Sequence, residues 1–130
     1  MALIAIADDH GNTRESITNC VKNVFSNPAD KIVICRSGDE LLSEVEGEDG
    51  LDMVILDNTM PGISGVKTAE RLRKIYPRLP IVFLSSEPRP SVLSIKDGVI
   101  WILKPVQNEK FEYVIKTMFE KFVEKPLRGA

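Results

Sequence analysis

Five short apolar runs constrain the fold of this 130-residue chain more strongly than any other feature. They are rich in Ile, Val and Leu, and they do not alternate with polar residues. Strands of a parallel sheet covered by helices have this composition, because both of their faces are buried. The sequence therefore predicts five buried strands, at Leu3–Ala7, Ile32–Cys35, Met53–Leu56, Ile81–Leu84 and Val99–Leu103.

Between these runs, apolar residues recur at the spacing of amphipathic helices. We expect the first helix to be capped by Asn12, with Glu15 as its partner, and the second to begin at a capping box that starts at Ser37. A third helix can start at Ser64 and must end before Pro77. The apolar positions of the last helix are Phe111, Val114, Ile115, Met118, Phe119 and Phe122.

The stretch between the fourth and fifth runs is the weakest part of the helical pattern. Pro88 and Pro90 fall where a fourth helix should begin, and proline is tolerated only in the first turn of a helix. The remaining residues, 91–96, suffice for about two turns at most. We therefore predict a short or irregular fourth helix within an open parallel α/β sheet with right-handed crossovers.

Charge and hydropathy exclude several classes of protein. The formal net charge of −2 argues against a domain that binds nucleic acid through a positive field. The apolar runs are far shorter than the roughly 18 to 20 residues that span a bilayer, and the N-terminus lacks the basic region of a signal peptide. Cys20 and Cys35 lie in apolar patterns and read as buried, reduced thiols, so we expect a cytoplasmic protein with no membrane partner.

Polar side chains follow four of the five predicted strands. Asp8 and Asp9 follow the first, Asp57 the third, Ser85 the fourth and Lys104 the fifth. The carboxyl ends of parallel strands meet at one edge of the sheet, which is where such folds bind ligands. Three clustered carboxylates repel one another, and oxygen ligands at an open edge favour Mg²⁺ over zinc, since no Cys or His is expected among them.

The same residues lie in stretches that resemble the receiver domain of two-component response regulators of the chemotaxis (CheY-like) type. The resemblance runs from about Leu3 to Val123. It implies a flavodoxin-like (βα)5 doubly wound sheet of strand order 2-1-3-4-5, in a receiver domain at 1–124 followed by a frayed tail at 125–130. The matching stretches are Ala7-Asp8-Asp9, Val54-Ile55-Leu56-Asp57, Met60-Pro61-Gly62-Ile63-Ser64-Gly65, Leu84-Ser85-Ser86 and Leu103-Lys104-Pro105.

The resemblance implies a phosphoacceptor next to a magnesium site. Asp57 would take a phosphoryl group from a histidine kinase or phosphotransfer protein. Asp9, Asp57 and the backbone carbonyl of Thr59 would bind Mg²⁺ directly, and Asp8 would hold it through water. His10, next to the acidic pair, is interpreted as a solvent-exposed loop residue.

The resemblance also implies a conformational switch. Ser85 would hydrogen-bond the phosphoryl group and move toward it. Lys104 would bridge to the phosphoryl group or the acidic pair, and the peptide bond between Lys104 and Pro105 would be cis. Trp101, three residues before Lys104, stands where the family carries a switch aromatic, although it could equally be an ordinary core or surface aromatic.

These roles predict a receiver that signals to a protein partner by conformational change and catalyses only its own phosphorylation and dephosphorylation. The downstream partner stays unknown, because the face on which the family docks partners begins at the rebuilt fourth helix. A receiver fragment of a hybrid kinase or longer regulator and a docking-only pseudo-receiver remain open. Thr59 argues against a haloacid-dehalogenase-type enzyme, because it stands where such enzymes require a second Asp. Asp8 and Asp9 argue against a flavodoxin-like cofactor binder, because they would repel the phosphate of the cofactor.

Overall fold

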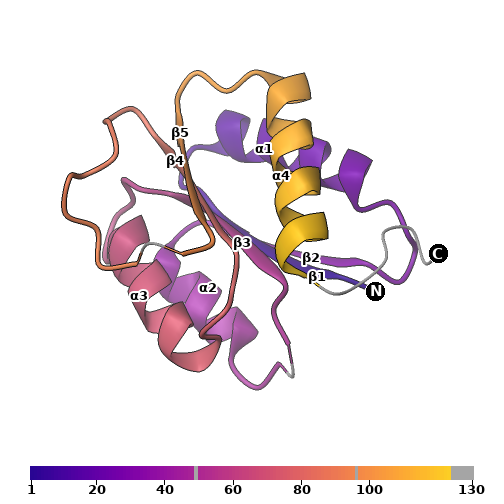
Figure 1. Cartoon of the computed structure of the whole chain (residues 1–130), viewed down its shortest axis with the longest axis horizontal. Coiled ribbons are helices and arrows are strands. Elements are labelled where there is room, and N and C mark those ends of the chain that lie inside the picture. The colour runs from indigo at the N-terminus through magenta and orange to yellow at the C-terminus, as the bar shows by residue number, and fades with distance from the viewer. Residues whose placement is uncertain (49, 96, 124–130) are drawn as a thin grey trace.

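The protein is a three-layer α/β sandwich, described here by a computed structural model over residues 1–48, 50–95 and 97–123. A parallel sheet of order β2-β1-β3-β4-β5 lies between two pairs of helices (Figure 1). This confirms the predicted flavodoxin-like doubly wound fold and its strand order. The elements are β1 (Leu3–Ala7), α1 (Gly11–Val24), β2 (Lys31–Cys35), α2 (Gly38–Val45), β3 (Met53–Asp57), α3 (Gly65–Ile75), β4 (Ile81–Ser85), β5 (Val99–Leu103) and α4 (Asn108–Phe122).

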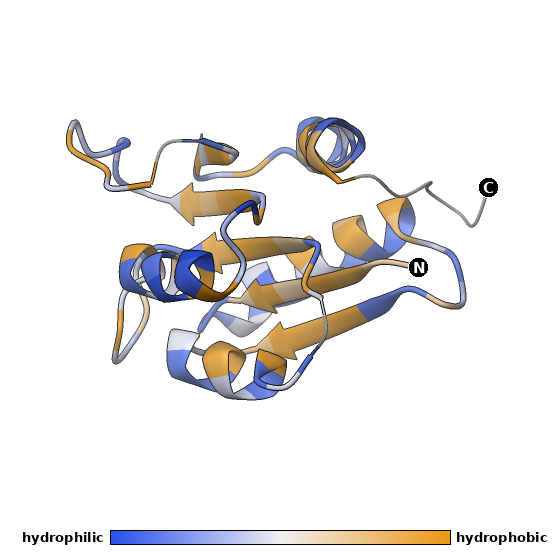
Figure 2. Cartoon of the chain, turned by 60° about the horizontal axis from the view of Figure 1, so that its bottom comes forward, coloured by the Kyte–Doolittle hydropathy of each residue, from blue (hydrophilic) through white to orange (hydrophobic). Residues whose placement is uncertain are grey.

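Two apolar layers hold the sheet between its helices. Ile4 and Ile6 of β1 point into the layer covered by α1 and α4, whereas Ala5 and Ala7 point into the layer covered by α2 and α3. Figure 2 shows the consequence: the central strands are hydrophobic throughout, and the helices are hydrophilic on their outer sides. Burial of both strand faces is therefore the reason for the uninterrupted apolar runs.

The first helix begins earlier than predicted, so the expected cap at Asn12 is wrong. His10 is the N-cap residue, and its carbonyl accepts the hydrogen bond of the Arg14 N–H at 2.8 Å. The guanidinium of Arg14 also donates to the backbone carbonyl of Asp8 at 2.8 Å. The helix thus has no side-chain cap, and this contact joins its first turn to the end of β1, next to His10.

The connection between β4 and β5 is the irregular element that the prolines predict. Residues 86–95 and 97–98 form turns and bends without a helix. Leu93 and Ile95 are buried, and the Ser94 hydroxyl donates to the carboxylate of Glu70 on α3. The chain therefore packs over α3 instead of covering β5 with a helix, and the predicted fifth helix is α4. No helix of the described residues is long and apolar enough to cross a membrane.

The predicted domain boundary at 124 and the tail at 125–130 lie outside the described residues, so both stay predictions.

Candidate phosphoacceptor site

The four predicted strand ends meet at one edge of the sheet. Asp57 and Ser85 are the last residues of β3 and β4, and Lys104 follows β5 directly. Neighbouring strands hold them in register: the backbone N–H of Lys104 donates to the carbonyl of Ser85 at 2.8 Å. The Lys104–Pro105 peptide bond is cis, as the resemblance predicts. Main-chain pairing of parallel strands is thus what brings these distant residues together.

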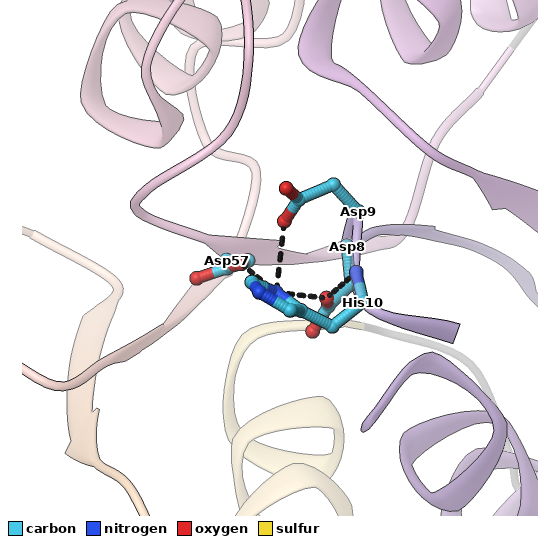
Figure 3. A group of neighbouring side chains, drawn as sticks. All are labelled: Asp8, Asp9, His10 and Asp57. Atoms are coloured by element: carbon cyan, nitrogen blue, oxygen red, sulfur yellow. Dashed lines mark hydrogen bonds and ion pairs between the residues drawn. The ribbon is translucent and has the colours of Figure 1, made fainter. Parts of the chain in front are cut away.

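Three carboxylates and an imidazole form the centre of the site. One ligand atom from each of Asp8, Asp9, His10 and Asp57 lies within 4.8 Å of all the others (Figure 3). Asp8 and Asp57 are only 1% and 2% exposed, and one oxygen of each, Oδ2, is buried without a hydrogen-bond partner among the described residues. Buried, unpartnered carboxylate oxygens are costly, and a bound cation would relieve that cost.

The local electrostatics leave the Asp57 carboxylate only partly neutralised. Burial raises the pKa of Asp57 above its usual value, and the neighbouring charge of Asp8 raises it further. The Lys104 ammonium, 3.2 Å from Asp57 Oδ1, and the backbone N–H of Thr59, 3.4 Å from the same oxygen, lower this pKa without cancelling the rise. The site therefore combines one fixed positive charge with an excess of negative charge.

The donor set suits a hard divalent cation such as Mg²⁺. Asp8, Asp9 and Asp57 offer carboxylate oxygens, and the side chain of Asp9 is 26% exposed, so the cluster is open to water. Mg²⁺ is bound in proteins by one or two carboxylates and several waters. Thr59, predicted to add its carbonyl, lies in the loop directly after β3.

Ser85 and Trp101 are linked through the loop that follows β4. The buried hydroxyl of Ser85 accepts a hydrogen bond from the Glu87 N–H at 3.0 Å. The indole N–H of Trp101 donates to the carbonyl of the same Glu87 at 2.9 Å, and its ring packs on Phe83 with centroids 5.0 Å apart. One residue therefore contacts both predicted switch residues.

Sequence reasoning missed the role of His10. Its side chain is 64% exposed, as a loop residue should be, yet its Nδ1 lies 3.0 Å from Asp9 Oδ1 and 3.7 Å from Asp57 Oδ2. Position in the sequence, directly after the acidic pair and before a helix, was the available signal. The zinc exclusion rested on the expected absence of His from this edge of the sheet, and the structure overturns that premise.

The comparisons with known proteins identify the family. Residues 4–116 match the family model of the response regulator receiver domain, so the chain belongs to that family of two-component signalling domains. Among solved structures, a CheY-like receiver domain protein from Methanospirillum hungatei JF-1 superposes with a TM-score of 0.79 at 21% identity, covering 93% of this chain and 95% of that one. A receiver domain from the hybrid histidine kinase CckA gives 0.73 at 20% identity, covering 91% and 99%. These likenesses show the same fold.

Curated relatives are longer than this chain. The glycerol metabolism activator of Pseudomonas putida is 36% identical over 93 residues, which are 72% of this chain and 41% of that protein. An uncharacterized transcriptional regulatory protein, YrkP, of Bacillus subtilis (strain 168) is 36% identical over 89 residues, covering 59% and 37%. The chain thus spans about two fifths of the length of the curated relatives it matches.

Proposed function

We propose that this chain is a phosphorylatable receiver whose Asp57 accepts a phosphoryl group from the phosphohistidine of a histidine kinase or phosphotransfer protein. The observation that carries the proposal is the environment of Asp57. Its buried carboxylate has Lys104 on one oxygen, and its second oxygen, beside Asp8 and Asp9, has no hydrogen-bond partner among the described residues. A nucleophile, a fixed cation and a candidate metal site are thus present at one strand end.

The transfer needs positioning and neutralisation of charge more than covalent assistance. An Asp57 oxygen forms the bond to phosphorus while the phosphorus–nitrogen bond of the donor breaks. The leaving imidazole keeps that electron pair and takes up a proton from solvent. Lys104 holds a positive charge beside the transferred group. Mg²⁺ bound by Asp9, Asp57 and the Thr59 carbonyl, with Asp8 acting through water, would supply the remaining positive charge at the phosphoryl oxygens.

A hollow beside Lys104 offers a place for the phosphoryl donor in this proposal. A hollow of about 520 Å³ lies next to Lys104, between the start of α1 and the β5–α4 loop. Its lining mixes polar groups of α1 with the loop residues Ser86, Pro105 and Val106. In our proposal, the histidine-bearing surface of the donor docks on this side, next to Lys104.

Phosphorylation would change the surface around the loop that follows β4. In our proposal, the Ser85 hydroxyl, which accepts from the Glu87 N–H, turns to donate its own O–H to the new phosphoryl oxygens, which are strong acceptors. Because Trp101 donates to the Glu87 carbonyl, the same movement disturbs the indole. The output is then a changed surface for a protein partner, and the chain acts on no substrate other than its own aspartyl phosphate.

Relatives named as transcriptional regulators favour a second arrangement, in which this receiver controls an attached or separate output domain. In that case, the output domain would contact nucleic acid, and the acidic receiver would not. A cytoplasmic location and an unidentified downstream protein are part of the same proposal. A docking-only receiver with the same site residues is the alternative that the first experiment tests.

Intact mass spectrometry tests phosphorylation directly. The chain is incubated with acetyl phosphate and Mg²⁺, and we expect a gain of one phosphoryl group that EDTA and Asp57→Asn both abolish. A beryllofluoride titration covers the case of rapid self-hydrolysis, since the fluoride complex mimics a phosphoryl group without being hydrolysed. If Mg²⁺ yields no mass gain and no beryllofluoride complex forms, the proposal fails and the docking-only receiver is the alternative that stands.

The switch has its own readout, because Trp101 is the only tryptophan. We expect its fluorescence to change on phosphorylation, and Lys104→Ala to retain Mg²⁺ binding while losing most of that change. An unaltered Trp101 response in Lys104→Ala would contradict the proposed coupling.

A further inference from the structure

His10 has a position that the proposed phosphotransfer does not use. Its Nδ1 lies 3.0 Å from Asp9 Oδ1, 3.7 Å from Asp8 Oδ1 and 3.7 Å from Asp57 Oδ2. Figure 3 shows the imidazole directed at the carboxylates of the three aspartates. One nitrogen therefore faces all three acids at once.

These separations resemble the edges of a metal coordination shell. In a tetrahedral zinc site with bonds of about 2.0–2.1 Å, neighbouring ligand atoms lie roughly 3.3–3.4 Å apart. The three distances from His10 Nδ1, 3.0 to 3.7 Å, bracket that value. A complete shell would require the side chains of His10 and Asp9, which are 64% and 26% exposed, to move toward the buried acids, because the ligand atoms of the cluster lie within 4.8 Å of one another.

The acidic cluster does not carry this argument alone. Asp8 and Asp57 are almost fully buried, and Oδ2 of each has no hydrogen-bond partner among the described residues. The backbone N–H of His10 donates to Asp8 Oδ1 at 2.8 Å and so holds that carboxylate toward the cluster. Two buried carboxylates, each with an oxygen that lacks a hydrogen-bond partner among the described residues, and one imidazole nitrogen therefore lie together at this edge of the sheet.

We propose that His10 Nδ1, together with carboxylate oxygens of Asp8, Asp9 and Asp57, binds Zn²⁺ in competition with Mg²⁺. The inference rests on the proposed magnesium site, because it uses the same three acids. Mg²⁺ prefers oxygen ligands and gains little from an imidazole, whereas Zn²⁺ binds imidazole well. Four protein ligands also fill a tetrahedral zinc shell, so bound Zn²⁺ occupies Asp57 and excludes its phosphorylation.

The remaining thiols do not compete for Zn²⁺. Cys20 and Cys35 are buried, and burial raises the pKa of their thiols to about 11 and about 12. Only the thiolate is a good metal ligand. His10 is also the only histidine of the sequence, so in a protein without a histidine tag every imidazole nitrogen signal comes from this residue.

The first test is nitrogen NMR of the ¹⁵N-histidine-labelled full chain during a Zn²⁺ titration. We expect one equivalent of Zn²⁺ to shift Nδ1 more than Nε2. Saturating Mg²⁺ should reverse the shift by competition. No shift, or a shift of Nε2 alone, would overturn the proposal without any variant being made.

The second test is calorimetry of metal binding to two matched variants. His10→Phe removes the nitrogen and should weaken Zn²⁺ binding by about tenfold or more, while changing Mg²⁺ binding by less than about threefold. Asp9→Asn should weaken both metals. Equal effects of His10→Phe on both metals would mean that His10 only orients Asp9, and would refute the ligand role. If the unaltered chain binds no Mg²⁺ and shows no Mg²⁺-dependent phosphorylation, the proposed function itself fails, which is a separable result.

Discussion

Gly65 controls how closely α3 approaches the phosphoacceptor loop, and its replacement by alanine is a sharp test of that packing. Gly65 is the first residue of α3, and its N–H donates to the Asn58 carbonyl at 3.0 Å. A Cβ at this position would lie 2.7 Å from the Asp57 carbonyl oxygen and 2.8 Å from the Asn58 Cα. Both are backbone atoms, which cannot rotate away.

The expected magnitude follows from this overlap. Ordinary contact begins at 3.4 Å, so the methyl group would be about 0.7 Å too close to the Asp57 carbonyl oxygen. Overpacking of this kind costs about 1–3 kcal/mol. At about 2.1 cal/mol/K per residue, each kcal/mol lowers the Tm of a chain of this size by roughly 4 °C. Gly65→Ala should therefore melt about 4–12 °C lower, and should also accept phosphate more slowly because the loop of Asp57 must move.

Gly11→Ala provides the matched control. Gly11 is also the first residue of a helix, and its nearest neighbour would be the end of the flexible Arg14 side chain at 3.8 Å. Both variants gain the same helix propensity, so their difference isolates the clash at Gly65. Thermal unfolding followed by circular dichroism, with phosphorylation by acetyl phosphate measured in parallel, is the assay. A Gly65→Ala chain that melts within about 2 °C of Gly11→Ala would refute the reasoning.

Three further predictions concern stability and reactivity. Because the pKa of Asp57 is raised, the folded state binds the proton of this carboxyl more tightly than the unfolded state does. The bound proton therefore stabilises the fold below the usual Asp pKa, and this stabilisation is lost as pH rises through the folded pKa. In EDTA, urea unfolding should therefore find Asp57→Asn more stable than the unaltered chain at pH 7 and equal to it near pH 4, whereas a less stable variant at pH 7 would contradict the account. The guanidinium of Arg73 donates to the carbonyls of Leu79, at 2.8 Å, and Asp97, so Arg73→Leu should lower the free energy of unfolding by about 1–3 kcal/mol; no loss in urea titrations would show that this tether is dispensable. The thiols of Cys20 and Cys35, whose pKa values burial raises to about 11 and about 12, should resist an aromatic disulfide reagent at pH 8 until urea is added, and rapid reaction of the folded chain would show the burial to be wrong.

The fold could be predicted from sequence because each strand is buried on both faces. That burial requires uninterrupted apolar runs, and the structure extends the predicted strands only by single polar residues such as Lys31, Asp57 and Ser85. The prolines likewise predicted an irregular β4–β5 connection. The course of that connection could not be predicted, since it depends on contacts with α3 that are distant in sequence, such as those of Arg73 with Asp97 and of Glu70 with Ser94.

The sequence predicted those residues of the site that lie at the ends of strands. The residue after a parallel strand lies at the same edge whatever the loop does, which is why Asp57 and Lys104 meet. His10 belongs to a loop whose direction is set by the contact between Arg14 and the Asp8 carbonyl. Its approach to Asp57, almost fifty residues away, depends on the pairing of β1 with β3, which the place of His10 after the acidic pair does not specify by itself.

Mapping the phosphoryl group tests the central claim most directly. The chain is treated with acetyl phosphate in the presence and absence of Mg²⁺, reduced with borohydride to convert any aspartyl phosphate to a stable alcohol, and digested for peptide sequencing by mass spectrometry. Our account predicts that the modified residue is Asp57, only in the presence of Mg²⁺, with Asp8 and Asp9 unmodified. Modification at Asp8 or Asp9, or equal modification of Asp57 without the metal, would contradict it.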